Sequence, residues 1–185
     1  MSAAELPARL VLNGTEYTVL RLLGKGTGGY TWLTQRDGAQ YALKRIHHEP
    51  CDYYQFGDKL AAELGDYERL SALGVPLPRL LDVDREGELL LKELLPGETV
   101  YQLVLRGAVE PWHWERVRAL SQSLRGAGLN LDWFPTNFIG REGILYYVDY
   151  ECNPYMDQWS FESWGVRYWF RTPEFDAYAK EHGDS

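Results

Sequence analysis

The stretch YTVLRLLGKGTGGYTWLTQRDGAQYALKRI, residues 17–46, decides the fold. Three runs rich in β-branched and aromatic residues, 17–23, 30–35 and 41–46, are separated by the glycine-rich residues 24–29 and by Asp37-Gly38. Runs of this composition bounded by turn residues are typical of β-strands, and Asp-Gly is a preferred two-residue hairpin turn. The stretch therefore predicts three consecutive strands with a glycine-rich connection between the first two.

The flanking sequence extends this sheet and adds one helix. Upstream, the run Arg9–Leu12 followed by Asn13-Gly14 predicts another hairpin strand. Downstream, apolar residues recur at helical spacing until Gly74 and Pro76 stop the pattern. The predicted downstream elements are a helix over 59–73 and strands over 80–83 and 88–93. Pro96-Gly97 then breaks the pattern, which predicts the end of a β-rich lobe.

The second half has a different pattern. It predicts a short helix over 98–105, a longer amphipathic helix over 112–124, and a hairpin built from 137–139 and 144–149 around Gly140–Gly143. The last 36 residues are dense in aromatic side chains. The predicted fold class is therefore α+β, with an N-terminal antiparallel β-lobe plus one helix over residues 1–95 and a small, mostly helical lobe over residues 96–185.

Composition limits the possible functions. The net charge of -8 and the pI of about 5.0 argue against an extended phosphate-binding nucleic-acid surface. Two cysteines, Cys51 and Cys152, provide no disulfide framework, and the four histidines have no metal-ligand spacing. The N-terminal residues do not resemble a signal peptide, and no apolar run is long enough to span a membrane. We expect a cytoplasmic protein without a membrane segment.

Two motifs in the first half suit phosphate binding. Gly24, Gly26 and Gly29 have G-x-G-x-x-G spacing between two predicted strands, where backbone amides can approach a phosphate chain without obstruction by a Cβ atom. Lys44 lies near the end of the third strand, within reach of such phosphates. An acidic partner for Lys44 is available on the following helix as Glu63 or Glu68, and the spacing favours Glu63. Taken singly, the glycines also suit an ordinary turn and Lys44 an ordinary surface lysine.

Two motifs in the second half suit hydroxyl and metal chemistry. Asp132 and Asn137 lie five residues apart in a loop that contains Pro135, and Asp149 follows a predicted strand. A carboxylate can orient a hydroxyl group or accept its proton, and carboxylate and amide oxygens are ligands that Mg²⁺ prefers. Each motif alone also fits an ordinary turn or a solvated acidic side chain.

These motifs together, in this order, resemble the protein-kinase-like superfamily, which includes aminoglycoside-type phosphotransferases and small RIO-like atypical kinases. The matching pieces extend from Leu22 to Glu151. The helix segment from Glu63 to Leu81, with Pro76 and Pro78 before the next strand, is especially similar to the phosphotransferase branch. The resemblance implies a two-lobed kinase-like fold with a truncated C-terminal lobe and transfer of the ATP γ-phosphoryl group to a hydroxyl group.

The resemblance also implies a role for each matching residue. Gly24, Gly26 and Gly29 would cover the phosphates, Lys44 would contact the α- and β-phosphates, and Glu63 would pair with Lys44. Asp132 would be the base or would position the hydroxyl group, and Asn137 and Asp149 would hold Mg²⁺. The residues implied at the adenine are the Glu93 carbonyl and the Leu95 amide at its edge, Leu23 and Ala42 above it, and Ile139 below it.

Several positions depart from the family pattern. Asn130-Leu131 replaces the usual His-Arg pair, Phe134 replaces a lysine, and Tyr150-Glu151 replaces Phe-Gly after the metal aspartate. Lys92 occupies a usually apolar position, and Thr31 replaces a valine. Only residues 150–185 follow Asp149, so no long activation segment is expected; Thr172-Pro173-Glu174 resembles its usual end only superficially.

Three functions stay open from the sequence: an active phosphotransferase whose acceptor is a protein Ser/Thr or a small molecule, a pseudokinase-like module that binds a nucleotide or a partner, and an ATP-hydrolysing switch. The aromatic residues of the tail predict a completed hydrophobic core, with a surface for a protein partner or the acceptor as the alternative.

Overall fold

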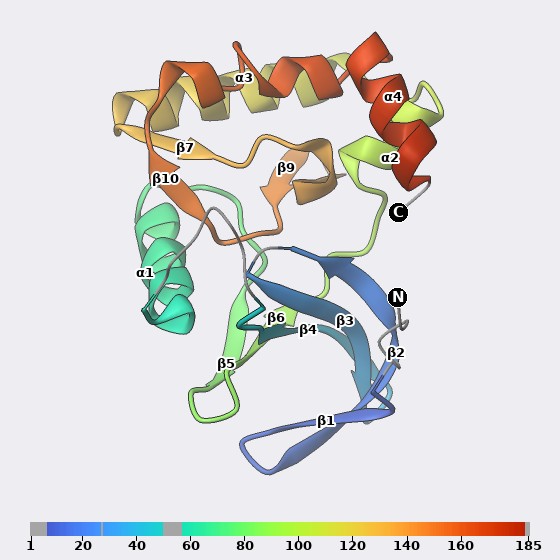
Figure 1. Ribbon diagram of the computed structural model, residues 1–185, viewed down its shortest axis with the longest axis vertical. Coiled ribbons are helices and arrows are strands. Elements are labelled where there is room, and N and C mark those ends of the chain that lie inside the picture. The colour runs from blue at the N-terminus through green and yellow to red at the C-terminus, as the bar shows by residue number, and fades with distance from the viewer. Residues whose placement is uncertain (1–6, 27, 50–56, 184–185) are drawn as a thin grey trace. The chain divides into compact units, whose positions relative to one another are not determined.

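The computed structural model describes residues 7–26, 28–49 and 57–183 of the chain (Figure 1). Thr27 of the glycine-rich segment, Cys51 and the first six residues lie outside this range. Contacts within the chain group it into two compact units, Met1–Ala62 with Pro78–Leu94 and Glu63–Leu77 with Leu95–Ser185. The structure is of the α+β class, as the sequence predicts.

A curled, six-stranded antiparallel sheet makes up most of the first unit (Figure 1). Its strands follow the order β1-β2-β3-β4-β6-β5. The bounds are β1 Arg9–Leu12, β2 Thr15–Lys25, β3 Gly29–Arg36, β4 Ala39–Ile46, β5 Leu80–Asp84 and β6 Leu89–Glu93. Each strand predicted from the sequence in this half is confirmed. The predicted turns at Asn13-Gly14 and Asp37-Gly38 are confirmed as well, since all four residues have positive φ angles.

One face of this sheet carries its hydrophobic core. Leu43 of β4 is fully buried and lies opposite Trp32 of β3 and Leu91 of β6. Together with neighbouring strand residues these side chains form one cluster: Leu10, Leu12, Tyr17, Val19, Trp32, Leu43, Leu89 and Leu91. Because side chains alternate between the two faces of a strand, Lys44 projects from the opposite face.

The two edges of the curled sheet are tied together by polar contacts. Asn13, in the turn between β1 and β2, donates its backbone N–H to the Asp84 carboxylate over 2.9 Å and its side-chain amide to Asp82 over 3.1 Å. Asp84 also accepts a bond from the Gly87 amide over 2.8 Å. These backbone donors lower the pKa of Asp84 below its ordinary value.

Helix α1, Lys59–Ala72, starts after Asp58, whose carboxylate accepts a hydrogen bond from the Ala61 amide over 2.8 Å. It ends before Gly74, which has a positive φ of 73°. The helix confirms the prediction over 59–73. Its residues from Glu63 onward group with the second unit, and Leu70 is fully buried in the core of that unit.

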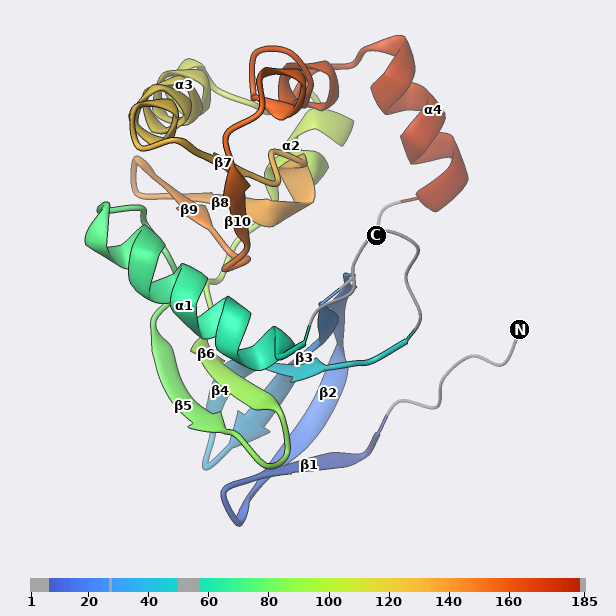
Figure 2. The ribbon, with the colours of Figure 1, turned by 60° about the vertical axis from the view of Figure 1, so that its left-hand side comes forward.

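The second unit combines helices with two small antiparallel sheets (Figure 2). Its helices are α2 Val100–Leu105, α3 Pro111–Gly126 and α4 Pro173–His182, and its strands are β7 Leu129–Leu131, β8 Phe138–Arg141, β9 Ile144–Tyr147 and β10 Cys152–Pro154. The pairs are β7 with β10 and β8 with β9. The helices near 98–105 and 112–124 and the hairpin are confirmed. The strand pair β7–β10 and helix α4 were not predicted from the sequence.

The aromatic tail completes the core of this unit. Tyr150, Phe161, Trp169 and Phe175 are buried, each less than 2% exposed. The prediction that the tail supplies core residues is confirmed for these four side chains, whereas Trp159 and Phe170 are about half exposed. Thr172-Pro173 turns out to begin α4: the Thr172 hydroxyl accepts a bond from the Phe175 amide over 3.1 Å, and Pro173 takes the first helical position.

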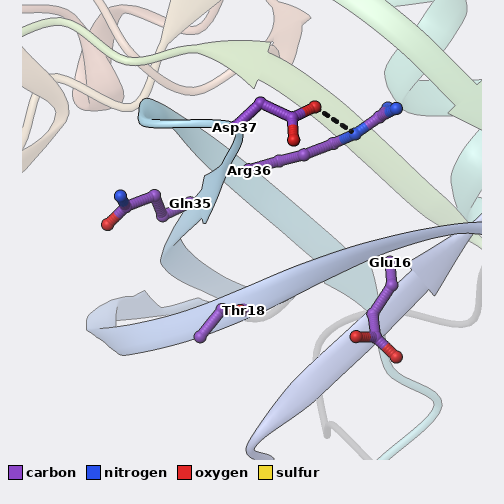
Figure 3. A pocket seen from close by; sticks show the side chains of 5 residues that line it. All are labelled: Glu16, Thr18, Gln35, Arg36 and Asp37. Atoms are coloured by element: carbon purple, nitrogen blue, oxygen red, sulfur yellow. Dashed lines mark ion pairs between the residues drawn. The ribbon is translucent and has the colours of Figure 1, made fainter.

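Among the helices that the structure describes, none is both long and apolar enough to cross a membrane. A shallow hollow lies on the first unit and is lined by Glu16, Thr18, Gln35, Arg36 and Asp37 (Figure 3). Arg36 and Asp37 form an ion pair of 3.1 Å there. None of the candidate site residues predicted from the sequence lines this hollow.

Candidate functional site

The glycine-rich segment connects β2 to β3 in the first unit. The Gly26 amide donates to the Gly29 carbonyl over 3.0 Å, which closes the connection, and the Tyr30 hydroxyl and Lys25 ammonium both bind Glu49. A Cβ atom at Gly29 would lie 2.4 Å from the Arg45 carbonyl oxygen, so the strand pairing itself requires this glycine. By contrast, a Cβ atom at Gly24 or Gly26 would meet no atom within 4 Å.

The side chain of Lys44 lies near Gly28 of this segment. It belongs to β4, is 8% exposed, and pairs in register with Thr31 of β3 and Leu90 of β6. A Cβ atom at Gly28 would lie 3.5 Å from the Lys44 Nζ atom. The Lys44 ammonium therefore lies near Gly28 within one unit. The approach of Gly24, Gly26 and Gly29 to phosphates bound by Lys44 stays a prediction.

Of the two candidate acidic partners, Glu63 is buried at 8% exposure and Glu68 is exposed. Burial favours Glu63, the residue that the spacing favoured, because a carboxylate on a solvated face has little need of a fixed partner. Glu63 groups with the second unit and Lys44 with the first. Their pairing stays a prediction.

The implied adenine-contacting residues divide between the units as well. In the first unit, the Glu93 side chain accepts a hydrogen bond from Arg79 Nε over 3.0 Å, Ala42 is half-buried, and Leu23 is 38% exposed. In the second unit, Leu95 and Ile139 are buried, and Ile139 forms a β-bridge with Thr99. Their meeting around one base stays a prediction.

The loop after β7 is closed by hydrogen bonds that fix Asp132 and Asn137. The Phe134 amide donates to Asp132 Oδ1 over 3.1 Å, and Asn137 Nδ2 donates to the Asp132 carbonyl over 3.3 Å. Pro135 starts a short 3-10 helix over Pro135–Asn137, because its fixed φ suits a first helical position. The loop thus turns both functional side chains toward the same region.

Asp149 joins this group through the adjacent hairpin. The Val148 amide donates to the Asn137 carbonyl over 2.9 Å, which places the end of β9 beside the loop. Asp149 Oδ1 accepts a bond from the Tyr150 amide over 2.8 Å, which orients the carboxylate. The second unit therefore brings together Asp132, Asn137 and Asp149, the three residues predicted to handle the hydroxyl group and the metal.

Electrostatics agrees with this proximity. The pKa of Asp132 is raised above its ordinary value, first because the surrounding protein desolvates the carboxylate and also because of the Asp149 charge; the Phe134 amide opposes the rise. Asp132 keeps an exposed surface, so its desolvation is partial. The pKa of the fully buried Tyr147 hydroxyl is also raised, by burial and then by the charges of Asp149 and Asp132. Two carboxylates that repel one another attract a cation.

The Asn137 amide oxygen and the Asp149 carboxylate would be a partial ligand set for a hard divalent cation such as Mg²⁺, which commonly keeps several waters and substrate phosphates as its other ligands. Within residues 7–26, 28–49 and 57–183, no three histidine, cysteine, aspartate or glutamate side chains gather closely enough to hold a metal ion. This donor set suits a metal that arrives with a phosphate-bearing substrate.

Phe134, one of the positions that depart from the kinase-like pattern, is part of an aromatic cluster. Its ring centroid lies 4.6 Å from that of Tyr178 in α4 and 5.0 Å from that of Tyr168. The pKa of Tyr178 is raised by burial and then by the Asp132 charge, which places this phenol near the predicted catalytic carboxylate. Tyr178 is not among the site residues predicted from the sequence, although the helix-start signal Thr172-Pro173 could have identified its element.

Trp133, the residue after Asp132, anchors this loop in the hydrophobic core of the second unit. Its ring is fully buried and stacks parallel to Phe138 with centroids 6.0 Å apart, and its carbonyl accepts a bond from Trp169 Nε1 over 2.9 Å. A Cβ atom at Gly165 would lie 2.5 Å from the Trp133 Cβ atom, so the tail packs tightly against the loop. The loop that carries Asp132 therefore rests on tightly packed aromatic side chains.

No protein-family model matches the chain, and no curated protein sequence matches it.

Proposed function

We propose that this protein is a Mg²⁺-dependent phosphotransferase with a two-lobed, protein-kinase-like fold, which transfers the γ-phosphoryl group of ATP to a hydroxyl group in the cytoplasm. The observation that carries the proposal is the convergence of Asp132, Asn137 and Asp149 in one unit, fixed by the bonds of the loop and the hairpin. The contact of Lys44 with the glycine-rich segment in the other unit supports it independently.

Each residue has a chemical task in this proposal. Asn137 and Asp149 would hold Mg²⁺, which neutralises phosphate charge. Lys44 and the backbone amides of the glycine-rich segment would bind phosphate oxygens, with Glu63 as the partner of Lys44. Asp132 would orient the acceptor hydroxyl and receive its proton as the phosphoryl group leaves ATP. Positioning and charge neutralisation then supply most of the rate acceleration.

A second candidate function is a kinase-like binding module without phosphotransfer. The observation that favours it is Phe134, whose ring packs among Tyr168 and Tyr178 at a position where active relatives carry a lysine. A protein partner at the tail would fit this function, since Trp159 and Phe170 are exposed. An absence of transfer to every acceptor, with nucleotide binding retained, would select this function.

The first test is thermal unfolding with increasing Mg-ATP. A ligand that binds only the folded state stabilises it by about 2.7 kcal/mol at 100 times its Kd, which is a clear shift in Tm. Lys44→Ala should shrink the shift. Arg45→Ala is the matched control, because Arg45 is the adjacent cation on β4 and its exposed side chain projects from the other face. No shift in the wild type up to millimolar Mg-ATP would refute the proposal.

The second test separates the roles of the two carboxylates with labelled γ-phosphate. Asp132→Ala should lower transfer by about 10²–10⁴-fold while Mg-ATP still raises Tm, because general-base residues act on the reaction and not on nucleotide affinity. Asp149→Asn should weaken the Mg²⁺-dependent part of binding. Unchanged turnover in the first variant, or an unchanged Mg²⁺ requirement in the second, contradicts the assigned role.

A further inference from the structure

Residues 47–49, which follow β4, contact the backbone of the glycine-rich segment. The His47 amide donates to the Gly28 carbonyl over 3.4 Å, and the His47 Nε2 atom lies 3.0 Å from the Gly26 carbonyl oxygen. The Glu49 amide donates to His47 Nδ1 over 3.2 Å, so a neutral imidazole carries its proton on Nε2 and donates it to Gly26. Residues 47–49 therefore make two hydrogen bonds to this backbone.

The Glu49 carboxylate adds contacts to both strands that flank the glycine-rich segment. It accepts a bond from the Tyr30 hydroxyl of β3 over 2.6 Å and forms an ion pair of 2.9 Å with Lys25 of β2. The Lys25 ammonium also lies 4.9 Å from the centre of the Tyr30 ring. The Tyr30 hydroxyl and then the Lys25 ammonium lower the pKa of Glu49, so the carboxylate is ionised at neutral pH. One charged group thus joins the end of β2 to the start of β3.

The end of β4 and the residues after it are themselves anchored in the first unit. The Ile46 amide donates to the Glu88 carbonyl over 3.0 Å, and His48 Nε2 lies 2.7 Å from the Glu88 carboxylate. Lys59, at the start of α1, donates to the His47 carbonyl over 2.8 Å. Contacts made from such an anchored support restrict the glycine-rich segment, because the segment can move only by losing them.

The contacts of Glu49 lie on the sheet face opposite Lys44. Trp32 belongs to the hydrophobic cluster of the sheet, and Tyr30, two residues away on β3, shares its face and packs against the cluster. Lys25 is in register with Tyr30 and projects from the same face. Glu49 and Tyr30 therefore act on the Lys44 face only through the backbone that they hold.

We propose that Glu49 is a positioning residue for phosphate binding, which holds the glycine-rich segment in the conformation that receives the phosphates of the nucleotide. This inference rests on the proposed function, in which backbone amides of the segment bind phosphate oxygens. A glycine-rich backbone has many accessible conformations, so a segment without these contacts would spend only part of its time in the binding conformation. The apparent Kd rises by the inverse of that fraction. Glu49 thus raises the affinity for phosphates, although a carboxylate by itself repels them.

The first experiment measures Mg-ATP binding by calorimetric titration, with the Tm of each variant without ligand as the check on folding. Tyr30→Phe removes only the hydroxyl and should weaken binding about fivefold, and Glu49→Lys should weaken it about tenfold. The sign of the second result is decisive, because an added positive charge near a polyphosphate would tighten binding if charge alone mattered. Glu16→Lys, which makes the same charge change in the exposed ion pair with Arg9, is the matched control and should not weaken binding.

Exchange of the two charges provides the rescue. Lys25→Glu and Glu49→Lys should each weaken Mg-ATP binding, and the protein with both substitutions should recover most of the wild-type affinity, because the ion pair is restored in reverse. Unchanged or tighter binding in Glu49→Lys, or no recovery in the double variant, would overturn the positioning role and leave the phosphotransferase proposal standing. A wild-type protein that binds no Mg-ATP would overturn the proposed function, and this inference with it.

A second readout needs no nucleotide. The Gly26 amide donates to the Gly29 carbonyl over 3.0 Å within the glycine-rich segment. If Glu49 holds this arrangement, hydrogen exchange at the Gly26 amide, measured by nuclear magnetic resonance, should be about fivefold faster in Tyr30→Phe than in the wild type. The Leu43 amide in the middle of β4 should keep its wild-type rate. Equal rates at Gly26 in the two proteins would show that Glu49 does not hold the segment.

Discussion

The His113 side chain caps the start of α3 through a hydrogen bond to the helix backbone. The residue is 3% exposed, its Nδ1 atom accepts a hydrogen bond from the Glu110 amide over 3.1 Å, and its ring stacks on Trp112 with centroids 3.7 Å apart. Burial lowers the pKa of the imidazole, while the Glu110 backbone and charge oppose the change. A bond that needs an unprotonated nitrogen makes this helix start sensitive to acid.

The expected result is a loss of stability on acidification that depends on His113. The pKa of His113 is lower in the folded state than its ordinary value of about 6.5, so the unfolded chain binds the proton first as the pH falls. The free energy of unfolding therefore decreases as the pH drops below about 6.5. Urea unfolding at about pH 7.5 and about pH 5 should show a larger loss for the wild type than for His113→Gln. That variant should itself cost about 1 kcal/mol at the higher pH through loss of the cap. His182→Gln, at an exposed residue, should retain the wild-type loss; equal losses in all three proteins would contradict the role of His113.

Cys152 is expected to be chemically inert in the folded protein. Burial, and then a 3.2 Å hydrogen bond to the Asp66 carboxylate, raise the pKa of its thiol to about 12, although Arg69 opposes the rise. At about pH 8 only about one thiol in ten thousand is then the reactive thiolate. In a Cys51→Ser background, a maleimide reagent should label Cys152 only after unfolding in denaturant. Rapid labelling of the native protein would show that the thiol is accessible and ionised.

At the scale of elements, the connection between β2 and β3 contains two kinds of glycine. Gly29 is required by the strand pairing, whereas Gly24 and Gly26 are not. Gly29→Ala should destabilise the protein by about 1–3 kcal/mol, because its Cβ atom would lie 2.4 Å from the Arg45 carbonyl oxygen. Gly24→Ala and Gly26→Ala should leave stability within about 0.5 kcal/mol, since nothing lies within 4 Å of either Cβ position.

These two tolerant glycines also test the phosphate-binding role of the segment. If the backbone of the segment approaches the phosphates, both variants should weaken Mg-nucleotide binding several-fold in titrations while their Tm without ligand stays at the wild-type value. Unchanged Mg-nucleotide binding in both variants would contradict the phosphate-binding role of Gly24 and Gly26. Only Gly29 would then be required, for the pairing of β3 with β4.

The elements differ in how far local sequence predicts them. The hairpins of the first half were predictable because Asn13-Gly14 and Asp37-Gly38 force a particular turn, independently of the rest of the chain. Strand β10 was not, because Cys152–Pro154 is only three residues long, contains a proline, and forms a strand through pairing with the distant β7. Helix α4 did carry a start signal at Thr172-Pro173, although the same residues also resemble the end of an activation segment.

The candidate site likewise contains residues that local sequence predicts and one that depends on contacts between distant segments. Asp132, Asn137 and Asp149, which the chemistry and order of the motifs indicated, lie together because a tight loop and an adjacent hairpin keep neighbours in sequence close in space. The nearness of Tyr178 to Asp132 could not be predicted, because it depends on how α4 packs against Phe134.

At the scale of the whole molecule, the compact units do not coincide with continuous halves of the chain. The segment Glu63–Leu77 groups with the second unit, and its Leu70 and Val75 are 0% and 6% exposed in the core of that unit. A fragment of residues 95–185 should therefore lack cooperative unfolding, since losing one buried leucine alone costs about 2–5 kcal/mol. A fragment of residues 57–185, which restores the segment, should unfold cooperatively in urea as followed by near-ultraviolet circular dichroism. Cooperative unfolding of the shorter fragment would show that the segment is dispensable.

This interleaving sets an order of events during synthesis. When residue 94 has left the ribosome, the strands of the six-stranded sheet are all available and the sheet can form. Leu70 and Val75 have also emerged by then, yet the rest of the core that buries them has not been translated. Until it appears, the nascent chain exposes the apolar residues at the end of α1, the kind of surface that chaperones bind and that promotes misassembly.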